Sequence, residues 1–172
     1  MSDNKVKMHV LSIHVVNHAG VLSRIAGLFS RRMYNIDSLS VGVTEDPEIS
    51  RMTIVTHADE NTFHQIQNQL AKLEDVKHIC ELKKEQSVLR EHVLIKVNSK
   101  DSNAIMQICQ IFRANVVDVS RNLLTLELTG GPSKISAFID LMDQFEIEGL
   151  VRTGLTGLKR GSTTEAEKKE NN

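Results

Sequence analysis

The spacing of hydrophobic residues changes sharply within residues 8–36, and the change marks a strand followed by a helix. In residues 8–16, Leu11, Ile13 and Val15 fall on one face, as alternate positions of a β-strand do. Beyond residue 20 the apolar residues recur at steps of three and four, the period of an amphipathic helix: Val21, Leu22, Ile25, Leu28, Phe29 and Met33. The pattern therefore predicts a tight strand-to-helix turn at residues 17–20.

The rest of the first half continues with two strands, a helix and a strand. Alternation at residues 35–44 and 49–57 predicts a hairpin around a polar turn. Asn61 or Thr62 is expected to cap the next helix, and residues 76–82 should form a last strand. The order β-α-β-β-α-β is typical of a four-stranded antiparallel sheet with both helices on one face, the ferredoxin-like arrangement.

The second half repeats the same six elements after roughly 80 residues, and its last strand is expected at residues 147–155. We therefore predict an α+β protein made of two ferredoxin-like βαββαβ sandwiches. Polar stretches set the expected boundaries: an N-terminal segment at 1–7, a first domain at 8–82, a linker at 83–91, a second domain at 92–160 and a disordered tail at 161–172.

Composition and charge limit the partners, the cellular location and the oligomeric state that we expect for the chain. The formal net charge of -1 and the pI near 6.7 give no basic footprint for nucleic acid or an anionic membrane. The sequence contains no signal-peptide pattern and no apolar run near the roughly 18 residues of a membrane span, so we expect a cytoplasmic protein. Each half is small and poor in aromatic residues, and covering its sheet edges with a second copy predicts a dimer.

The turn at residues 17–20 is the best candidate for binding chemistry. Gly20 lacks a Cβ, so backbone or ligand can approach it closely, and the first N–H groups of the following helix have no partner within that helix. A carboxylate is suited to that position. Alternatively, Gly20 only makes a sharp turn and Asn17 only caps the helix. The pattern alone leaves both interpretations open.

Patterns of catalytic and metal-binding residues are missing from the sequence. The seven histidines are scattered, Cys80 and Cys109 are isolated, and there is neither a nucleophile elbow nor a Walker loop. His18, within the glycine turn, is the one histidine worth testing as a ligand contact. An RNA-binding use of this fold needs aromatic residues on strands, but all five phenylalanines fall on predicted helices. An acylphosphatase would need an arginine in the first loop, and residues 17–20 contain none.

Several stretches together resemble the regulatory small subunits of acetolactate synthase (acetohydroxyacid synthase), whose N-terminal half is an ACT domain. In the first half they are residues 17–24 (NHAGVLSR), 27–32 (GLFSRR), 34–39 (YNIDSL) and 50–54 (SRMTI). In the second half they are residues 111–114 (IFRA), 117–119 (VDV) and 154–161 (GLTGLKRG). The resemblance covers nearly the whole chain apart from its two ends.

This resemblance implies a regulatory subunit without an active site of its own. Such a subunit binds the large catalytic subunit, activates it, and makes it sensitive to feedback inhibition by a branched-chain amino acid, usually valine. Thiamine diphosphate, magnesium and FAD would belong to the catalytic partner, and this chain would hold no cofactor or metal. The alternative is an amino-acid-sensing ACT protein that regulates a different enzyme.

The resemblance also implies where the effector binds, namely between the ACT domains of two chains in a homodimer. The matching positions are Asn17, His18, Ala19, Gly20, Val21 and Leu22 of one chain and Asn35 and Ile36 of its neighbour. A helix N-terminus suits the carboxylate of the effector, an asparagine can accept from its ammonium, and aliphatic residues suit its side chain.

Met33 departs from the family pattern, which usually has glycine there, and this alters the turn that leads out of the helix. Residues 98–103 lack a glycine turn, so no equivalent pocket is expected in the second half.

Overall fold

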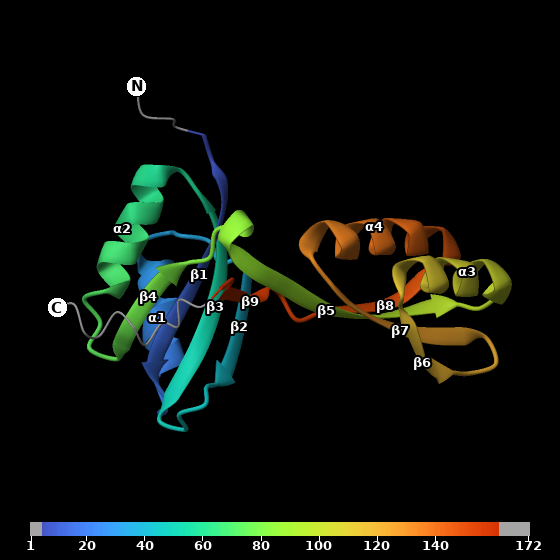
Figure 1. Cartoon of the computed structure of the whole chain (residues 1–172), viewed down its shortest axis with the longest axis horizontal. Coiled ribbons are helices and arrows are strands. Elements are labelled where there is room, and N and C mark those ends of the chain that lie inside the picture. The colour runs from blue at the N-terminus through green and yellow to red at the C-terminus, as the bar shows by residue number, and fades with distance from the viewer. Residues whose placement is uncertain (1–4, 162–172) are drawn as a thin grey trace. The chain divides into compact units, whose positions relative to one another are not determined.

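The computed structural model describes residues 5–161, and these form two compact units, each with its own hydrophobic core (Figure 1). The first unit comprises residues 5–88 and 155–161, and the second comprises Leu89–Gly154. The predicted disordered tail, beyond Gly161, and residues 1–4 of the predicted N-terminal segment lie outside the described residues.

The first unit has the predicted order of strands and helices. Its elements are β1 (Lys7–Val16), α1 (Val21–Arg31), β2 (Ser38–Val43), β3 (Ile49–Ala58), α2 (Glu60–Leu70) and β4 (Val76–Glu81). All neighbouring strands are antiparallel, in the order β2-β3-β1-β4. β1 and β3 therefore form the centre of the sheet, while β2 and β4 are its edges.

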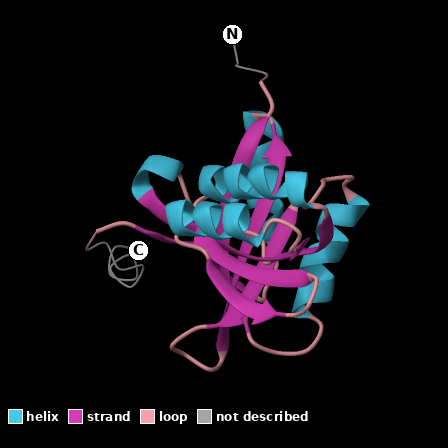
Figure 2. Ribbon diagram, turned by 90° about the vertical axis from the view of Figure 1, so that its right-hand side faces the viewer, coloured by secondary structure: helices cyan, strands magenta, loops and turns pink. Residues whose placement is uncertain are grey.

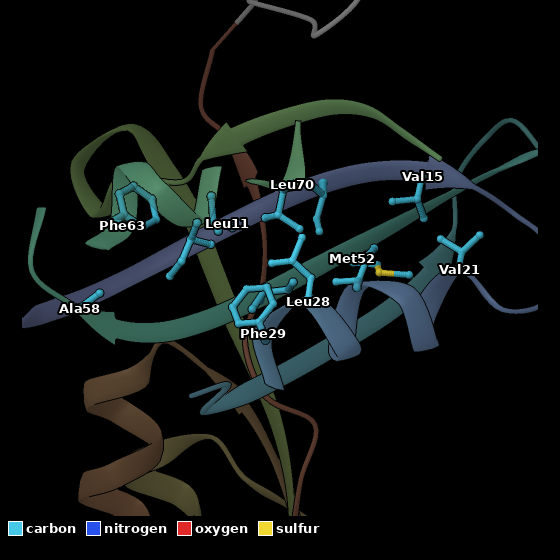
Figure 3. Packing of buried hydrophobic residues seen from close by; sticks show 13 residues of the cluster. Leu11, Val15, Val21, Leu28, Phe29, Met52, Ala58, Phe63 and Leu70 are labelled. Carbon is cyan, nitrogen blue, oxygen red and sulfur yellow. The ribbon is translucent and has the colours of Figure 1, made fainter. Parts of the chain in front are cut away.

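Both helices of this unit pack on the same face of the sheet. The alternating residues Leu11, Ile13 and Val15 of β1 are fully buried and belong to one cluster with residues of β3, α1 and α2. Figure 3 shows side chains from these elements, such as Phe29 of α1 and Phe63 of α2, gathered around the two central strands. The apolar faces predicted for the strands and for the helices thus pack against each other, and the prediction of a ferredoxin-like fold is confirmed.

The second unit repeats this arrangement. Its elements are β5 (Ser87–Asn98, of which residues 87 and 88 count with the first unit), α3 (Ser102–Phe112), β6 (Asn115–Val119), β7 (Leu123–Gly130), α4 (Pro132–Met142) and β8 (Ile147–Arg152). The antiparallel strand order is β6-β7-β5-β8. α3 and α4 lie side by side over this sheet, as Figures 1 and 2 show, and their buried residues share one cluster with β5 and β7.

The structure differs from the sequence prediction between the units and near the end of the chain. Residues 83–91, predicted as a linker, contain a short 3-10 helix (Lys84–Gln86) and the first five residues of β5. The strand predicted at 147–155 is interrupted at Gly154, which has a φ of 77°, and a separate strand β9 (Thr156–Lys159) follows. The backbone N–H of Arg160 then donates to the carbonyl oxygen of Gln86 at 2.8 Å, and its side-chain Nε donates to that of Ser87, the first residue of β5, at 3.1 Å. Residues 155–160 therefore belong to the first unit instead of the second.

The N-cap of α2 also differs from the prediction. Asp59 caps the helix, because its carboxylate accepts hydrogen bonds from the N–H of Thr62 at 2.9 Å and from the Thr62 hydroxyl at 2.9 Å. An acidic cap two residues earlier than Asn61 satisfies the same helix-terminal donors. None of the helices within residues 5–161 is long and apolar enough to cross a membrane.

Candidate functional site

The turn between β1 and α1 leaves an open space at the start of the helix. Gly20 has a left-handed backbone (φ 91°, ψ -16°) and precedes the first residue of α1. Within the described residues no side chain caps this helix, and a Cβ built on Gly20 would meet no heavy atom within 4 Å. By contrast, aspartates cap α2 and α3, while α4, like α1, begins at a glycine without a side-chain cap. The α1 terminus therefore presents unpaired N–H groups and a positive dipole end to a small open surface.

Asn17 fixes the turn to the β2–β3 hairpin. Its N–H donates to the carbonyl oxygen of Glu48 at 2.7 Å, and its side-chain Nδ2 donates to the carbonyl oxygen of Pro47 at 2.8 Å. Its Oδ1 accepts from the Ser50 hydroxyl at 3.0 Å. Asn17 is therefore not the helix cap, and its hydrogen bonds hold the turn against the hairpin instead. One acceptor position on Oδ1 remains, since an amide oxygen accepts two hydrogen bonds.

Asp75 holds the other side of the turn, and sequence reasoning missed it. One carboxylate oxygen of Asp75 lies 3.3 Å from His18 Nε2 and the other lies 2.7 Å from Arg24 Nε. The Asp75 side chain is only 15% exposed, so this ion pair is better shielded from solvent than an ordinary surface pair. Asp75 thereby anchors a residue of the turn and the first helical turns of α1 to the loop before β4.

The remaining predicted residues of the turn divide between the core and the surface. Val21 is 2% exposed and belongs to the core, so only its backbone N–H is available to a ligand. The buried Val21 side chain therefore offers no apolar surface to a ligand. Leu22, at 45% exposure, and Ala19 are exposed and do offer such a surface.

Asn35 and Ile36 precede β2, and the backbone of Asn35 is hydrogen-bonded to β3. The Asn35 carbonyl oxygen accepts from the Thr56 hydroxyl at 2.7 Å, and its side-chain Nδ2 donates to Asp37 Oδ1 at 2.7 Å. Ile36 is half-buried and packs against the first core. His57 Nδ1 lies 2.7 Å from the other oxygen of Asp37.

The structure does not bring the two predicted stretches together within one chain. Ser38 pairs with Val55, and Val55 pairs with Val10, so these three residues lie in one row across the sheet. Asn17 is seven residues further along β1, about 23 Å away at the usual rise of a strand. One amino acid therefore cannot touch both stretches of the same chain.

The turn offers groups that can bind a ligand, whereas the described residues hold no cluster suited to a metal ion. No group of three or more histidine, cysteine, aspartate or glutamate side chains that could hold a metal ion occurs within residues 5–161. Both cysteines are buried, and burial raises the pKa of the Cys109 thiol, which keeps it in its unreactive neutral form.

Comparisons with known proteins agree with this description. A model of the AHAS small subunit-like ACT domain matches residues 11–78, and a model of the small subunit of acetolactate synthase matches residues 90–161. The chain is 43% identical over 159 residues to the probable acetolactate synthase small subunit of Methanothermobacter thermautotrophicus, covering 91% of this chain and 95% of that protein. It is 46% identical over 156 residues to its counterpart from Archaeoglobus fulgidus, covering 90% of this chain and 98% of that protein.

A solved structure extends the similarity to the fold. The crystal structure of the acetolactate synthase small subunit from Thermotoga maritima matches with a TM-score of 0.85 at 39% identity, covering 91% of this chain and 99% of that chain. Family models that match both halves, together with relatives of similar length, show that this chain belongs to the family of acetolactate synthase small subunits.

Proposed function

We propose that this chain is the regulatory subunit of an acetolactate synthase and senses valine at the interface between two ACT domains. It has no active site of its own. It activates the large catalytic subunit in the cytoplasm and confers feedback inhibition on the first common step of branched-chain amino-acid biosynthesis. Thiamine diphosphate, magnesium and FAD belong to the catalytic partner.

The observation that carries this proposal is the uncapped, open start of α1. The effector carboxylate sits beside Gly20 and accepts hydrogen bonds from the first N–H groups of α1, which have no partner within the helix. Asn17 Oδ1 retains one acceptor position for the ammonium group. Ala19 and Leu22 are exposed beside the turn and contact the aliphatic side chain, and His18, held by Asp75, lies in the same turn.

A second copy completes the site through the β2 edge. β2 is an edge strand, and its Val41 and Val43 are 47% and 61% exposed. Val43 pairs with Ser50, whose hydroxyl bonds to Asn17, so the Val43 end of β2 lies near the glycine turn. Antiparallel pairing of two β2 edges sets the Val43 end of one copy beside the Ser38 end of the other. The turn of one chain thereby approaches Asn35 and Ile36 of its neighbour.

Regulation follows if valine favours one arrangement of this dimer. A ligand that contacts both chains stabilises the arrangement in which the contacts form, and a differential affinity of a few kcal/mol is enough to shift a coupled equilibrium. The catalytic subunit responds to that shift with lower activity.

Isothermal titration of the full chain with valine, leucine, isoleucine and lysine tests the proposal. We expect saturable valine binding, no lysine binding, and loss of valine binding in Gly20→Asp, whose carboxylate occupies the place of the ligand's own. Gly131→Asp is the matched control: Gly131 also precedes a helix, and its Cβ position is also open, but its φ is -72° and it lies in the second unit. This control should bind valine normally.

The same variants in a complex with the large subunit test regulation. Gly20→Asp should still activate the catalytic subunit while the enzyme loses its sensitivity to valine. Absence of valine binding both in the isolated chain and in the complex would refute the effector site. Failure to co-purify with a thiamine-dependent large subunit, with valine binding intact, would instead favour an ACT regulator of a different enzyme.

A further inference from the structure

We propose that Asp37 and His57 are positioning residues of the β2 side of the effector site, where they fix which end of the Asn35 amide faces the ligand. This inference rests on the proposed function. The three side chains form a chain of hydrogen bonds: Asn35 Nδ2 donates to Asp37 Oδ1 at 2.7 Å, and His57 Nδ1 lies 2.7 Å from Asp37 Oδ2. None of them was singled out for this role by its position in the sequence.

The backbone around Asp37 is held as firmly as its side chain. The Asp37 N–H donates to the carbonyl oxygen of Val55 at 2.9 Å, and the Thr56 hydroxyl donates to the carbonyl oxygen of Asn35 at 2.7 Å. The segment before β2 is therefore tied to β3 at two successive residues of β3. With the backbone held, only the side-chain torsions of Asn35 can still change, and the hydrogen bond to the Asp37 carboxylate restricts them.

The chemistry of the carboxylate decides the orientation of the amide. An ionised aspartate only accepts hydrogen bonds, so Asn35 must turn its NH2 group toward Asp37. Its carbonyl Oδ1 then lies on the opposite side of the planar amide and is available as an acceptor. An acceptor suits the ammonium group of an amino acid, whereas a flipped amide would present its NH2 group to that ammonium and repel it.

His57 holds the second oxygen of the Asp37 carboxylate. The carboxylate of Asp37 is 31% exposed, and its two oxygens are engaged by Asn35 and His57. Contacts at both oxygens limit the rotation of the carboxylate and keep its Oδ1 directed at the Asn35 amide.

Titration of valine into full-length variants tests this role. Asp37→Leu removes the acceptor and should raise the valine Kd about tenfold, the usual effect of losing one oriented hydrogen bond to a charged group. Asp37→Asn keeps an acceptor oxygen for Asn35 and should stay within about threefold of the wild type. The rescue by asparagine separates loss of orientation from loss of charge.

A double-mutant cycle shows whether Asp37 acts through Asn35. In an Asn35→Ala background, Asp37→Leu should have no further effect on the valine Kd, because the amide that it orients is gone. Thermal melting of each variant checks that the first unit remains folded. An equal further loss in the Asn35→Ala background, or an unchanged Kd in Asp37→Leu, would overturn the inference while valine binding by the wild type stands. A wild-type chain that binds no valine, alone or with the large subunit, refutes the proposed function and this inference with it.

Discussion

Gly20 precedes α1 and Met33 follows it, and both have a left-handed backbone. Gly20, with φ 91°, has no Cβ and adopts this conformation without strain. Met33, with φ 57°, does have a Cβ, and its side chain is 91% exposed, so no burial compensates for the strain. Met33 therefore adopts the left-handed conformation after α1 at a cost in stability.

Replacing Met33 with glycine should stabilise the protein. Glycine fits the left-handed conformation, and we expect a gain of about 0.5–1 kcal/mol in the free energy of unfolding, reduced by the greater freedom of glycine in the unfolded chain. Urea denaturation of the full chain, followed through the unfolding of the first unit, measures this gain. Met33→Ala is the control, since it removes the exposed side chain but keeps the Cβ and should give no comparable gain. Equal stabilisation by alanine would show that the exposed thioether, and not the backbone, was unfavourable.

At the scale of elements, α2 and α3 begin at a capping aspartate, whereas α1 and α4 begin at a glycine without a side-chain cap. The capping carboxylates accept hydrogen bonds from backbone N–H groups of these helices. Asp59 accepts from the N–H of Thr62 at 2.9 Å, and Asp101 accepts from the N–H of Ala104 at 3.1 Å. The start of α1 has no such side chain among the described residues. Since a capping carboxylate would occupy the place of a ligand carboxylate, the absence of a cap on α1 agrees with the proposed effector site.

Asp59 should contribute to stability in a pH-dependent way. Hydrogen bonds from the backbone and hydroxyl of Thr62 lower the pKa of Asp59 below its usual value. A carboxyl with a lowered folded-state pKa stabilises the protein fully above its unfolded pKa of about 3.9, and this contribution is lost as the pH falls through the folded-state pKa. We expect Asp59→Ala to lower the melting temperature at pH 7.

Comparison with Asp59→Asn separates the cap from the charge. Asparagine keeps the acceptor oxygen, so it should melt closer to the wild type than alanine does at pH 7. The difference between wild type and Asp59→Asn should shrink as the pH falls below 4, when the aspartate takes up its proton. A difference that persists unchanged at low pH would contradict the role of the ionised carboxylate.

At the scale of the whole molecule, the two units have separate cores. Phe63 is fully buried in the first core and Phe138 in the second. Phe138→Ala should destabilise the second unit by about 3–5 kcal/mol, the usual effect of emptying a buried phenylalanine site. Hydrogen exchange followed by mass spectrometry should show faster exchange within Leu89–Gly154 and unchanged exchange in residues 10–80. Phe63→Ala should give the reverse pattern, and acceleration in both units by either change would show that they unfold as one.

The strands and helices, their order and the repeat could be predicted from the hydrophobic pattern of the chain. Alternation in β1 and the three- and four-residue steps of α1 are local signals, because each depends on which face of one element is buried. The glycine turn was likewise visible, since a glycine between a strand and a helix is a local conformational signal. The fold class and the β1–α1 part of the candidate site could therefore be predicted from the sequence.

The distant side chains that support these local features became visible in the folded structure alone. Asp75 pairs with His18 and Arg24, and His57 engages Asp37, across intervals that carry no periodic signal. The return of residues 155–160 to the first unit, after a whole intervening unit, is of the same kind. Such contacts depend on how packed elements bring their ends together in space, and spacing along the chain does not record that distance. The physical reason is that periodicity encodes burial within one element, whereas hydrogen bonds between elements are fixed only when the sheet has formed.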